Sequence, residues 1–312
     1  MGHVYRGSVA VIVAAILWSL DGLLRRGLYS LPPSVVVFWE HLLGLALLIP
    51  IIIFSIRQYK QFTRKQWLSI ILVSALSGAL GTYFYTSALG KVQYIPYSVV
   101  VLLQQLQPLF AIAAGAILLH EPITKKFVAY AAMALVAAYF VSFPDLRVHL
   151  NTGAGTALAA LLAIGAAAAW GSSTAFSKYT LQNTSFVHTT AARFAFTPVF
   201  ALLLTIILGK TQNLGAVTIV QWKYLVAITF STGLVALAIY YYGLQKILAS
   251  RSTLLELTWP ISAVIIGFIA LHERMATTQW LGSFTLLVTM YLVVKESKQI
   301  TMPISETKNP GP

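Results

Sequence analysis

Five ionisable side chains lie within long apolar stretches of the sequence: Asp21, Glu40, His41, Arg193 and Glu256. If these stretches cross a membrane, each charge costs roughly 2.5–3.5 kcal/mol and needs a partner or a function. Carboxylates, an imidazole and a guanidinium can neutralise one another, bind a polar substrate or take up a proton. These residues are therefore the first candidates for binding or transport, and the alternative is that they only hold helices together.

A second pattern is the tripeptide Leu-His-Glu, which occurs in LLHEPIT at 118–124 and again in ALHERMA at 270–276. A zinc protease needs His-Glu-x-x-His, and neither copy has the second histidine. Each copy ends one apolar run and precedes another, so we expect Glu121 and Glu273 to cap the next helix, where negative charge is favourable. The sequence also has no cysteine and no nucleotide-binding motif, so we predict no metal, no cofactor and no enzyme.

The composition indicates an integral membrane protein. Charged residues make up 9% of the chain and apolar residues 58%, whereas a soluble domain has roughly 25% charged residues. The apolar runs are about twenty residues long and do not alternate, so they predict helices rather than a barrel. The net charge of +13 comes from short loops beside these runs, and we predict contact with the lipid bilayer rather than with nucleic acid.

The fold class that we predict is all-α, with ten transmembrane helices. The chain divides into a first five-helix repeat at 1–150, a second five-helix repeat at 151–295, and a disordered cytoplasmic tail at 296–312. Lys and Arg are more frequent in the segments that share a side with the N-terminus, which places both termini in the cytoplasm. The expected spans are about 8–28, 34–56, 67–89, 97–119, 127–143, 156–177, 187–208, 222–243, 252–271 and 277–294.

The two halves resemble each other when the chain is shifted by 152 residues, or by 155 in the region of the third span. Residues of rare types match in order: Trp18 with Trp170, His41 with Arg193, Tyr85 with Tyr240, Gln104 with Glu256, and Pro108 with Pro260. Because each half has five spans, an odd number, the second half enters the membrane from the opposite side. Inverted repeats around a central cavity are the architecture of alternating-access transporters.

This inverted symmetry predicts two polar layers, one on each side of the membrane midplane. We expect Arg193 and Glu256 to face each other across the cavity on the cytoplasmic side. His41, with Asp21 or Glu40, is expected to form the outer layer. Glu40 is the weaker candidate, because neighbouring residues on a helix do not both point inward well.

Aromatic residues give a further set of candidates. Trp18 and Trp170 lie near the middle of their spans, away from the membrane interfaces where Trp usually collects, and either stack on a substrate or pack between helices. Tyr85 and Tyr240 are expected to line the cavity because they are equivalent in the two repeats. The neighbouring tyrosines are expected to anchor span ends at the interface: Tyr83, Tyr241 and Tyr242.

The paired motifs are similar to those of the drug/metabolite transporter superfamily, specifically its EamA-type members. The resemblance rests on WSLDG at 18–22, WGSST at 170–174, and the proline-centred segments ending in Leu-His-Glu. It implies a ten-helix exporter of small metabolites or amino acids, with a cavity between the halves, in the inner membrane of a bacterium. The family commonly carries Arg where this chain has His41 in its first half and Arg193 in its second, so the role of His41 is open.

We therefore predict a secondary active transporter that exports a small amphiphilic metabolite such as an amino acid, by proton coupling or exchange, as a monomer or homodimer. A drug or nucleotide-derivative carrier is the alternative of the same fold. A membrane-embedded enzyme and a non-transporting scaffold are the alternatives of another class. The predicted substrate-binding residues are Trp18, Asp21, His41, Tyr85, Gln104, Trp170, Arg193, Tyr240 and Glu256.

Overall fold

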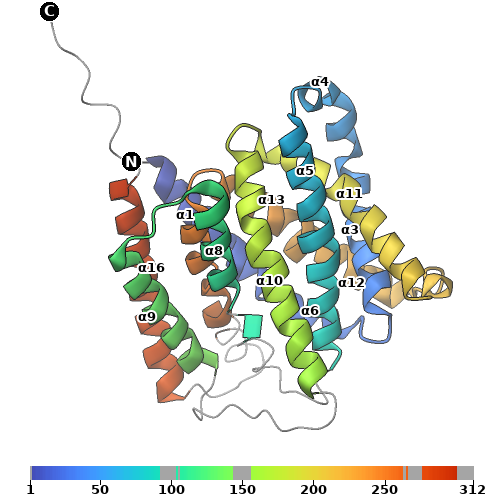
Figure 1. Cartoon of the computed structure of the whole chain (residues 1–312). Coiled ribbons are helices and arrows are strands. Elements are labelled where there is room, and N and C mark those ends of the chain that lie inside the picture. Colours follow the sequence, from blue (N-terminus) through green and yellow to red (C-terminus); the bar gives the residue numbers. More distant parts are fainter. Residues whose placement is uncertain are drawn as a thin grey trace, which may run out of the picture.

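The computed structural model describes residues 2–91, 103–104, 106–142, 156–262, 265 and 276–300 of the chain. Within these ranges the backbone forms helices and turns but no strand, which confirms the predicted all-α class. The helices are α1 (Gly2–Trp18), α2 (Asp21–Arg26), α3 (Pro33–Phe54), α4 (Ile56–Tyr59), α5 (Arg64–Val73), η1 (Ser74–Gly81), α6 (Thr82–Leu89), α8 (Gln107–Leu119), α9 (Lys125–Ser142), α10 (Thr156–Leu181), α11 (Phe186–Ile207), η2 (Thr211–Asn213), α12 (Ile219–Ile228), η3 (Thr229–Gly233), α13 (Leu234–Leu244), α14 (Ala249–Leu255) and α16 (Thr277–Ile300), shown in Figure 1.

Seven segments of the described chain are long and apolar enough to cross a membrane, and α8 is a shorter apolar helix. A multi-span membrane protein is therefore confirmed, whereas the number of ten spans stays a prediction. The last helix, α16, continues to Ile300, past the start of the predicted tail at Glu296. The seven segments are His3–Arg26, Pro33–Phe54, Arg64–Leu89, Leu158–Leu181, Phe186–Ile207, Ile219–Leu244 and Thr277–Glu296.

Apolar side chains cover the outside of the molecule, and polar ones are buried. Phe54, Ile117 and Ile207 are 86%, 73% and 79% exposed, whereas Glu40 and Arg193 are 4% and 8% exposed. In water, an apolar surface of this extent would drive association. Lipid solvates such a surface well, so the protein needs few charged residues on its outside.

The helices pack in pairs that follow the internal repeat. Equivalent helices of the two halves pack on each other: α3 lies along α11, and α9 along α16 (Figure 1). The remaining contacts come in matched sets, since α1 packs on α13 while α10 packs on η1 and α6. The contact of α1 with α13 therefore corresponds to the contact of α10 with α6, with the roles of the two halves exchanged.

Two helices begin with the same capping sequence. The Thr63 side chain accepts the backbone N–H of Gln66, and the Gln66 side chain accepts that of Thr63, at the start of α5. Thr218 and Gln221 repeat this capping box at the start of α12. Each helix then changes to π geometry, in η1 and in η3. Short π segments inside helices occur frequently at functional sites, and both of these border the cavity described next.

Candidate functional site

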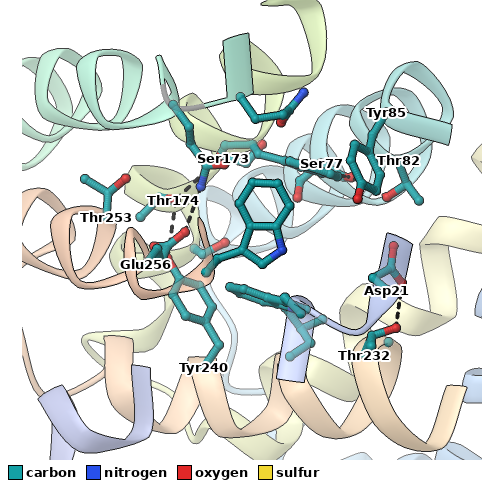
Figure 2. A pocket seen from close by; sticks show the side chains of 18 of the residues that line it. Asp21, Ser77, Thr82, Tyr85, Ser173, Thr174, Thr232, Tyr240, Thr253 and Glu256 are labelled. Atoms are coloured by element: carbon teal, nitrogen blue, oxygen red, sulfur yellow. Dashed lines mark hydrogen bonds between the residues drawn. The ribbon is translucent and has the colours of Figure 1, made fainter. Parts of the chain in front are cut away.

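A cavity of about 190 Å³ lies among helices of both halves, and Figure 2 shows it from close by. Since one water needs roughly 10–15 Å³ of such space, the cavity has room for about a dozen waters or a small organic molecule. The structure brings all the predicted binding residues to its wall, and their role in binding stays a prediction. They are Trp18, Asp21, His41, Tyr85, Gln104, Trp170, Arg193, Tyr240 and Glu256.

Two Trp–Tyr pairs form aromatic parts of the wall. The rings of Trp18 and Tyr240 have centroids 5.1 Å apart at an interplanar angle of 53°, and those of Trp170 and Tyr85 are 5.2 Å apart at 54°. Each pair joins a Trp of one half to a Tyr of the other, so the pairs are equivalent under the repeat. The Trp170 indole also donates to the backbone oxygen of Ser77 in η1 at 3.0 Å. The rings are thereby held in place and offer flat apolar faces to the cavity.

The charged group that was predicted for the outer layer centres on Arg25 rather than on His41. Arg25 pairs with Asp21 one helical turn before it and donates to Glu40 at 2.9 Å and to Thr86 at 3.2 Å. The Thr232 hydroxyl donates to Asp21 at 2.6 Å, as Figure 2 shows. Two carboxylates therefore share one buried guanidinium. Arg25 was counted only among the basic residues at the outer side, and its spacing of four residues from Asp21 on a helix was the signal for this pair.

His41 lies apart from these carboxylates. Its Nδ1 lies 2.9 Å from the backbone oxygen of Val37, and its ring packs on Phe194 with centroids 5.2 Å apart. Glu40 and His41 are only 4% and 5% exposed, and both line the cavity. The expectation that these neighbours do not both point inward was wrong, since both border the cavity on a helix that packs against α11, η3 and α6.

Arg193 is held by neutral partners. Its guanidinium donates to the Tyr241 hydroxyl and to the Ser77 hydroxyl, both at 2.9 Å. Tyr241 is 1% exposed, so the expectation that it anchors a span end at the membrane interface was wrong. The Nε of Arg193 has no hydrogen-bond partner among the described residues. One donor of this cation is thus left without a partner.

Glu256 also has neutral partners. One carboxylate oxygen accepts from the Tyr240 hydroxyl at 2.8 Å and the other from the Gln107 amide at 2.7 Å. Arg193 and Glu256 therefore line the same cavity without forming the expected ion pair. The Tyr241 and Ser77 hydroxyls bond to Arg193, and the Tyr240 hydroxyl and the Gln107 amide bond to Glu256. Hydroxyl residues cost too little inside a membrane helix to be recognised from the sequence.

Gln104 is the repeat equivalent of Glu256, and its side-chain amide is hydrogen-bonded through its nitrogen atom. Its amide nitrogen donates to the backbone oxygen of Ala163 at 2.8 Å. Its amide oxygen has no partner among the described residues. A buried acceptor without a partner is costly, so this oxygen is suited to receive a hydrogen bond from a bound molecule.

Glu121 caps a different helix from the one predicted. Its carboxylate accepts the backbone N–H groups of Ala249 and Ser250 at 2.6 and 2.9 Å and the Ser250 hydroxyl at 2.6 Å. The capped helix is α14, in the second half, whereas α9 is capped by Thr124 through the N–H of Phe127 at 3.0 Å. The predicted principle, a carboxylate at the positive end of a helix, holds. The predicted partner was wrong, because helix ends that meet in space need not be adjacent in sequence.

The Leu-His-Glu motif contributes to no metal site in the part of the chain that the structure describes, where no cluster of three His, Cys, Asp or Glu side chains occurs. His120 follows the end of α8 with a left-handed φ of 54°. The second copy, with His272 and Glu273, lies outside the described residues.

Comparison with known proteins gives consistent relatives over nearly the whole chain. The riboflavin transporter ImpX of Fusobacterium nucleatum is 28% identical over 302 residues, which cover 95% of this chain and 99% of that protein. The uncharacterized transporter YoaV of Bacillus subtilis is 22% identical over 293 residues, covering 91% and 95%. A protein of known crystal structure, 17% identical, superposes with a TM-score of 0.73 over 94% of this chain and 98% of its own, which shows a shared fold.

Both halves of the chain also match one family separately. Residues 5–143 and residues 157–295 each match the EamA-like transporter family. The family and these relatives are transporters, which excludes the alternative of a membrane-embedded enzyme. The matched motifs and the family agree with the drug/metabolite transporter superfamily that the sequence resembles. The chain belongs to the EamA-like transporter family.

Proposed function

We propose that this protein is a secondary transporter that carries a planar, hydrogen-bonding heterocyclic metabolite across the plasma membrane by alternating access. The observation that carries the proposal is the presence of two repeat-related Trp–Tyr pairs in the wall of one membrane-enclosed cavity. Aromatic rings stack on flat substrates with about 0.5–1.5 kcal/mol per pair beyond area burial. A substrate with an extended planar ring system fits such walls best.

Riboflavin is the first candidate substrate. The relative ImpX is named a riboflavin transporter, and it is similar to this chain over 302 residues. A flavin has a flat tricyclic ring with carbonyl acceptors and an imide N–H donor, and a sugar-like chain of hydroxyls. The cavity offers complementary groups, among them the Gln104 amide oxygen, the Gln107 amide and the Arg193 guanidinium.

An amphiphilic amino acid, the substrate class predicted from the sequence, is the second candidate. Arg193 and Glu256 line the same cavity and bond to neutral partners rather than to each other. A zwitterion could therefore place its carboxylate at Arg193 and its ammonium group at Glu256. Its apolar side chain would then lie against the Trp–Tyr pairs.

Alternating access follows from the proposed inverted repeat. The helix contacts are supportive, since those of α1 with α13 correspond to those of α10 with α6. If the halves exchange conformations, the cavity that faces one side of the membrane becomes accessible from the other. We propose that both termini are cytoplasmic and that the cycle runs in the direction of export.

Counterflow in proteoliposomes tests this function. Vesicles containing the full chain and loaded with unlabelled riboflavin should accumulate external labelled riboflavin, whereas empty vesicles should not. Trp18→Ala and Trp170→Ala should each reduce uptake about tenfold, because a lost stacking surface costs on the order of 1.4 kcal/mol. Trp280→Ala is the matched control: Trp280 lies on α16, is 58% exposed and should be dispensable.

The same vesicles distinguish the two substrate classes. Counterflow of tryptophan or another apolar amino acid, without riboflavin, would assign the second candidate. Failure to exchange either class, in protein that is folded and monodisperse, would overturn the proposed function.

A further inference from the structure

Glu256 differs from the buried carboxylates in how it is neutralised. Asp21 and Glu40 share the guanidinium of Arg25, and Glu296 lies 3.6 Å from that of Arg251. Glu121 accepts three hydrogen bonds at the start of α14. Glu256 accepts only from the Tyr240 hydroxyl and the Gln107 amide, with no cation at ion-pair distance among the described residues.

The position of Glu256 within the membrane opposes a negative charge. Glu256 lies in the turn between α14 and the helical residues 258–262, so one helix ends and another begins there. An ionised carboxylate without a cation is unfavourable in the membrane interior. Its repeat equivalent, Gln104, is an uncharged amide of nearly the same shape. The first half thus shows that this position tolerates a neutral group.

Apart from Tyr240, which donates to Glu256, the charged or titratable groups around Glu256 have other partners. Of the elements packed against α14, α13 brings Tyr240 and Tyr241, α10 brings Lys178, and α16 brings Glu296. Lys178 donates to the backbone oxygens at 244 and 245, and Tyr241 accepts from Arg193. The groups that α1 and α8 bring to this part of the cavity, Trp18 and Gln107, carry no charge. The charged groups elsewhere on the cavity wall are Asp21, Arg25, Glu40, His41 and Arg193.

We propose that Glu256 is the residue that binds the coupling proton of this transporter. This inference rests on the proposed function and assigns its driving ion to one named group. Glu256 borders the cavity, so a proton can reach it from whichever side the cavity faces. Protonation removes a charge that no cation offsets, while the bonds to Tyr240 and Gln107 keep the carboxyl group in place.

Proton and substrate compete for this carboxyl group. An ionised carboxylate has about four acceptor positions, and two of them are occupied by Tyr240 and Gln107. A substrate N–H, such as the imide of a flavin, bonds more strongly to the ionised carboxylate than to the protonated carboxyl group. Binding of the proton therefore weakens binding of the substrate, and binding of the substrate weakens binding of the proton. The cycle exchanges one proton moving in for one substrate moving out, and Glu256 ends as it began.

Infrared spectroscopy tests the proton site without any substrate. The purified full-length chain should show a protonated-carboxyl band that disappears as the pH is raised. Glu256→Gln should abolish this band, and Glu40→Gln should keep it, because Glu40 is a buried carboxylate that has a cation. Loss of the band in Glu40→Gln but not in Glu256→Gln would overturn the proposal.

A measurement on the unchanged chain covers the case in which Glu256→Gln fails to fold. A hydrophobic carbodiimide reacts with protonated buried carboxyl groups, and peptide mass spectrometry should place its adduct on Glu256. Excess substrate should lower the labelling at least tenfold through competition. An adduct on another carboxyl group, or labelling that substrate does not affect, would contradict the proposal.

Transport against a pH gradient tests the coupling itself. With one proton exchanged per substrate, each unit of pH gradient should support an accumulation of about tenfold at equilibrium. Glu256→Gln should give no accumulation, and any counterflow that it retains should not depend on pH. If the wild type lacks riboflavin counterflow while the infrared band behaves as described, the substrate is wrong and the proton site stands. Accumulation by Glu256→Gln at the wild-type level would overturn the proton site alone.

Discussion

Arg25 is the centre of a buried charged group in the wall of the cavity. It is 3% exposed and donates to side chains on three different helices, those of Asp21, Glu40 and Thr86. Removing one member of a buried charged group is costly, because the others remain as charges without partners. Two carboxylates inside a membrane protein would be left next to each other.

Arg25→Met should therefore lower the free energy of unfolding by about 3–5 kcal/mol. Thermal unfolding in detergent, or urea unfolding followed by fluorescence, measures this loss. Arg26→Met is the matched control, since Arg26 is the next residue and is exposed. Adding Glu40→Gln to Arg25→Met should recover part of the stability. Equal stability of the Arg25 and Arg26 variants would show that the ion pairs of Arg25 contribute little.

Residue-level prediction from the sequence succeeded where a residue type is unusual for its surroundings. Charges and mid-span tryptophans inside apolar runs indicated the cavity wall, because each is expensive or rare in lipid. Arg25 was missed because it was counted only toward the charge of the outer side, near the end of the first span. Ser77 and Thr232 were missed because small hydroxyl residues are common in membrane helices and give no such signal.

At the scale of helices, the π segment η1 brings the third span close to α11. Gly78 lies in this segment, and a Cβ atom there would lie 2.4 Å from the Thr197 hydroxyl and 2.6 Å from its methyl group. Ser74 in the same segment donates to the backbone oxygen of Arg193 at 3.2 Å. Arg193 is thus positioned by the close contact of two helices, and this contact needs a glycine.

Gly78→Ala should destabilise the protein by about 1–3 kcal/mol through overpacking. Gly215→Ala is the matched control, because a Cβ atom at Gly215 meets no atom within 4 Å. Adding Thr197→Ala to Gly78→Ala should restore much of the stability, since it removes both clashing atoms. Midpoints of thermal unfolding would measure all three variants. A Gly78→Ala protein as stable as the Gly215→Ala protein would contradict this account of the contact.

The existence of the helices was predictable, and their irregularities were not. Apolar runs of about twenty residues indicate spans because they match the thickness of a bilayer. The turn between α1 and α2 and the π geometry of η1 and η3 leave this hydropathy pattern unchanged, so nothing in the pattern indicated them. The same limit explains why the partner of Glu121 was predicted wrongly. Its helix-capping chemistry was clear from the sequence, but the helix that it caps, α14, is distant in the sequence.

At the scale of the whole molecule, the internal repeat explains why the cavity wall has pairs of similar residues. The two Trp–Tyr pairs have nearly the same geometry, with centroids 5.1 and 5.2 Å apart. The charged groups break this symmetry, since Arg25 and Glu256 have no charged equivalents in the other half. We interpret the shared aromatic parts as the substrate site and the unequal charges as the source of coupling.

The overall arrangement was predictable because rare residues match in order between the halves. The sequence did not indicate which helices contact one another, because the packing of one half on the other depends on surface shapes that hydropathy does not describe. The match of each half to one family supports the repeat. The inversion of the second half is the step on which alternating access rests.

Labelling of single cysteines tests that inversion most directly. The chain has no cysteine, so His120→Cys and His272→Cys each introduce one reactive thiol, at equivalent positions of the two repeats. In oriented membranes, a maleimide that cannot cross the bilayer should label position 120 from one side and position 272 from the other. Labelling of both positions from the same side would contradict the inverted repeat, and with it the alternating-access mechanism.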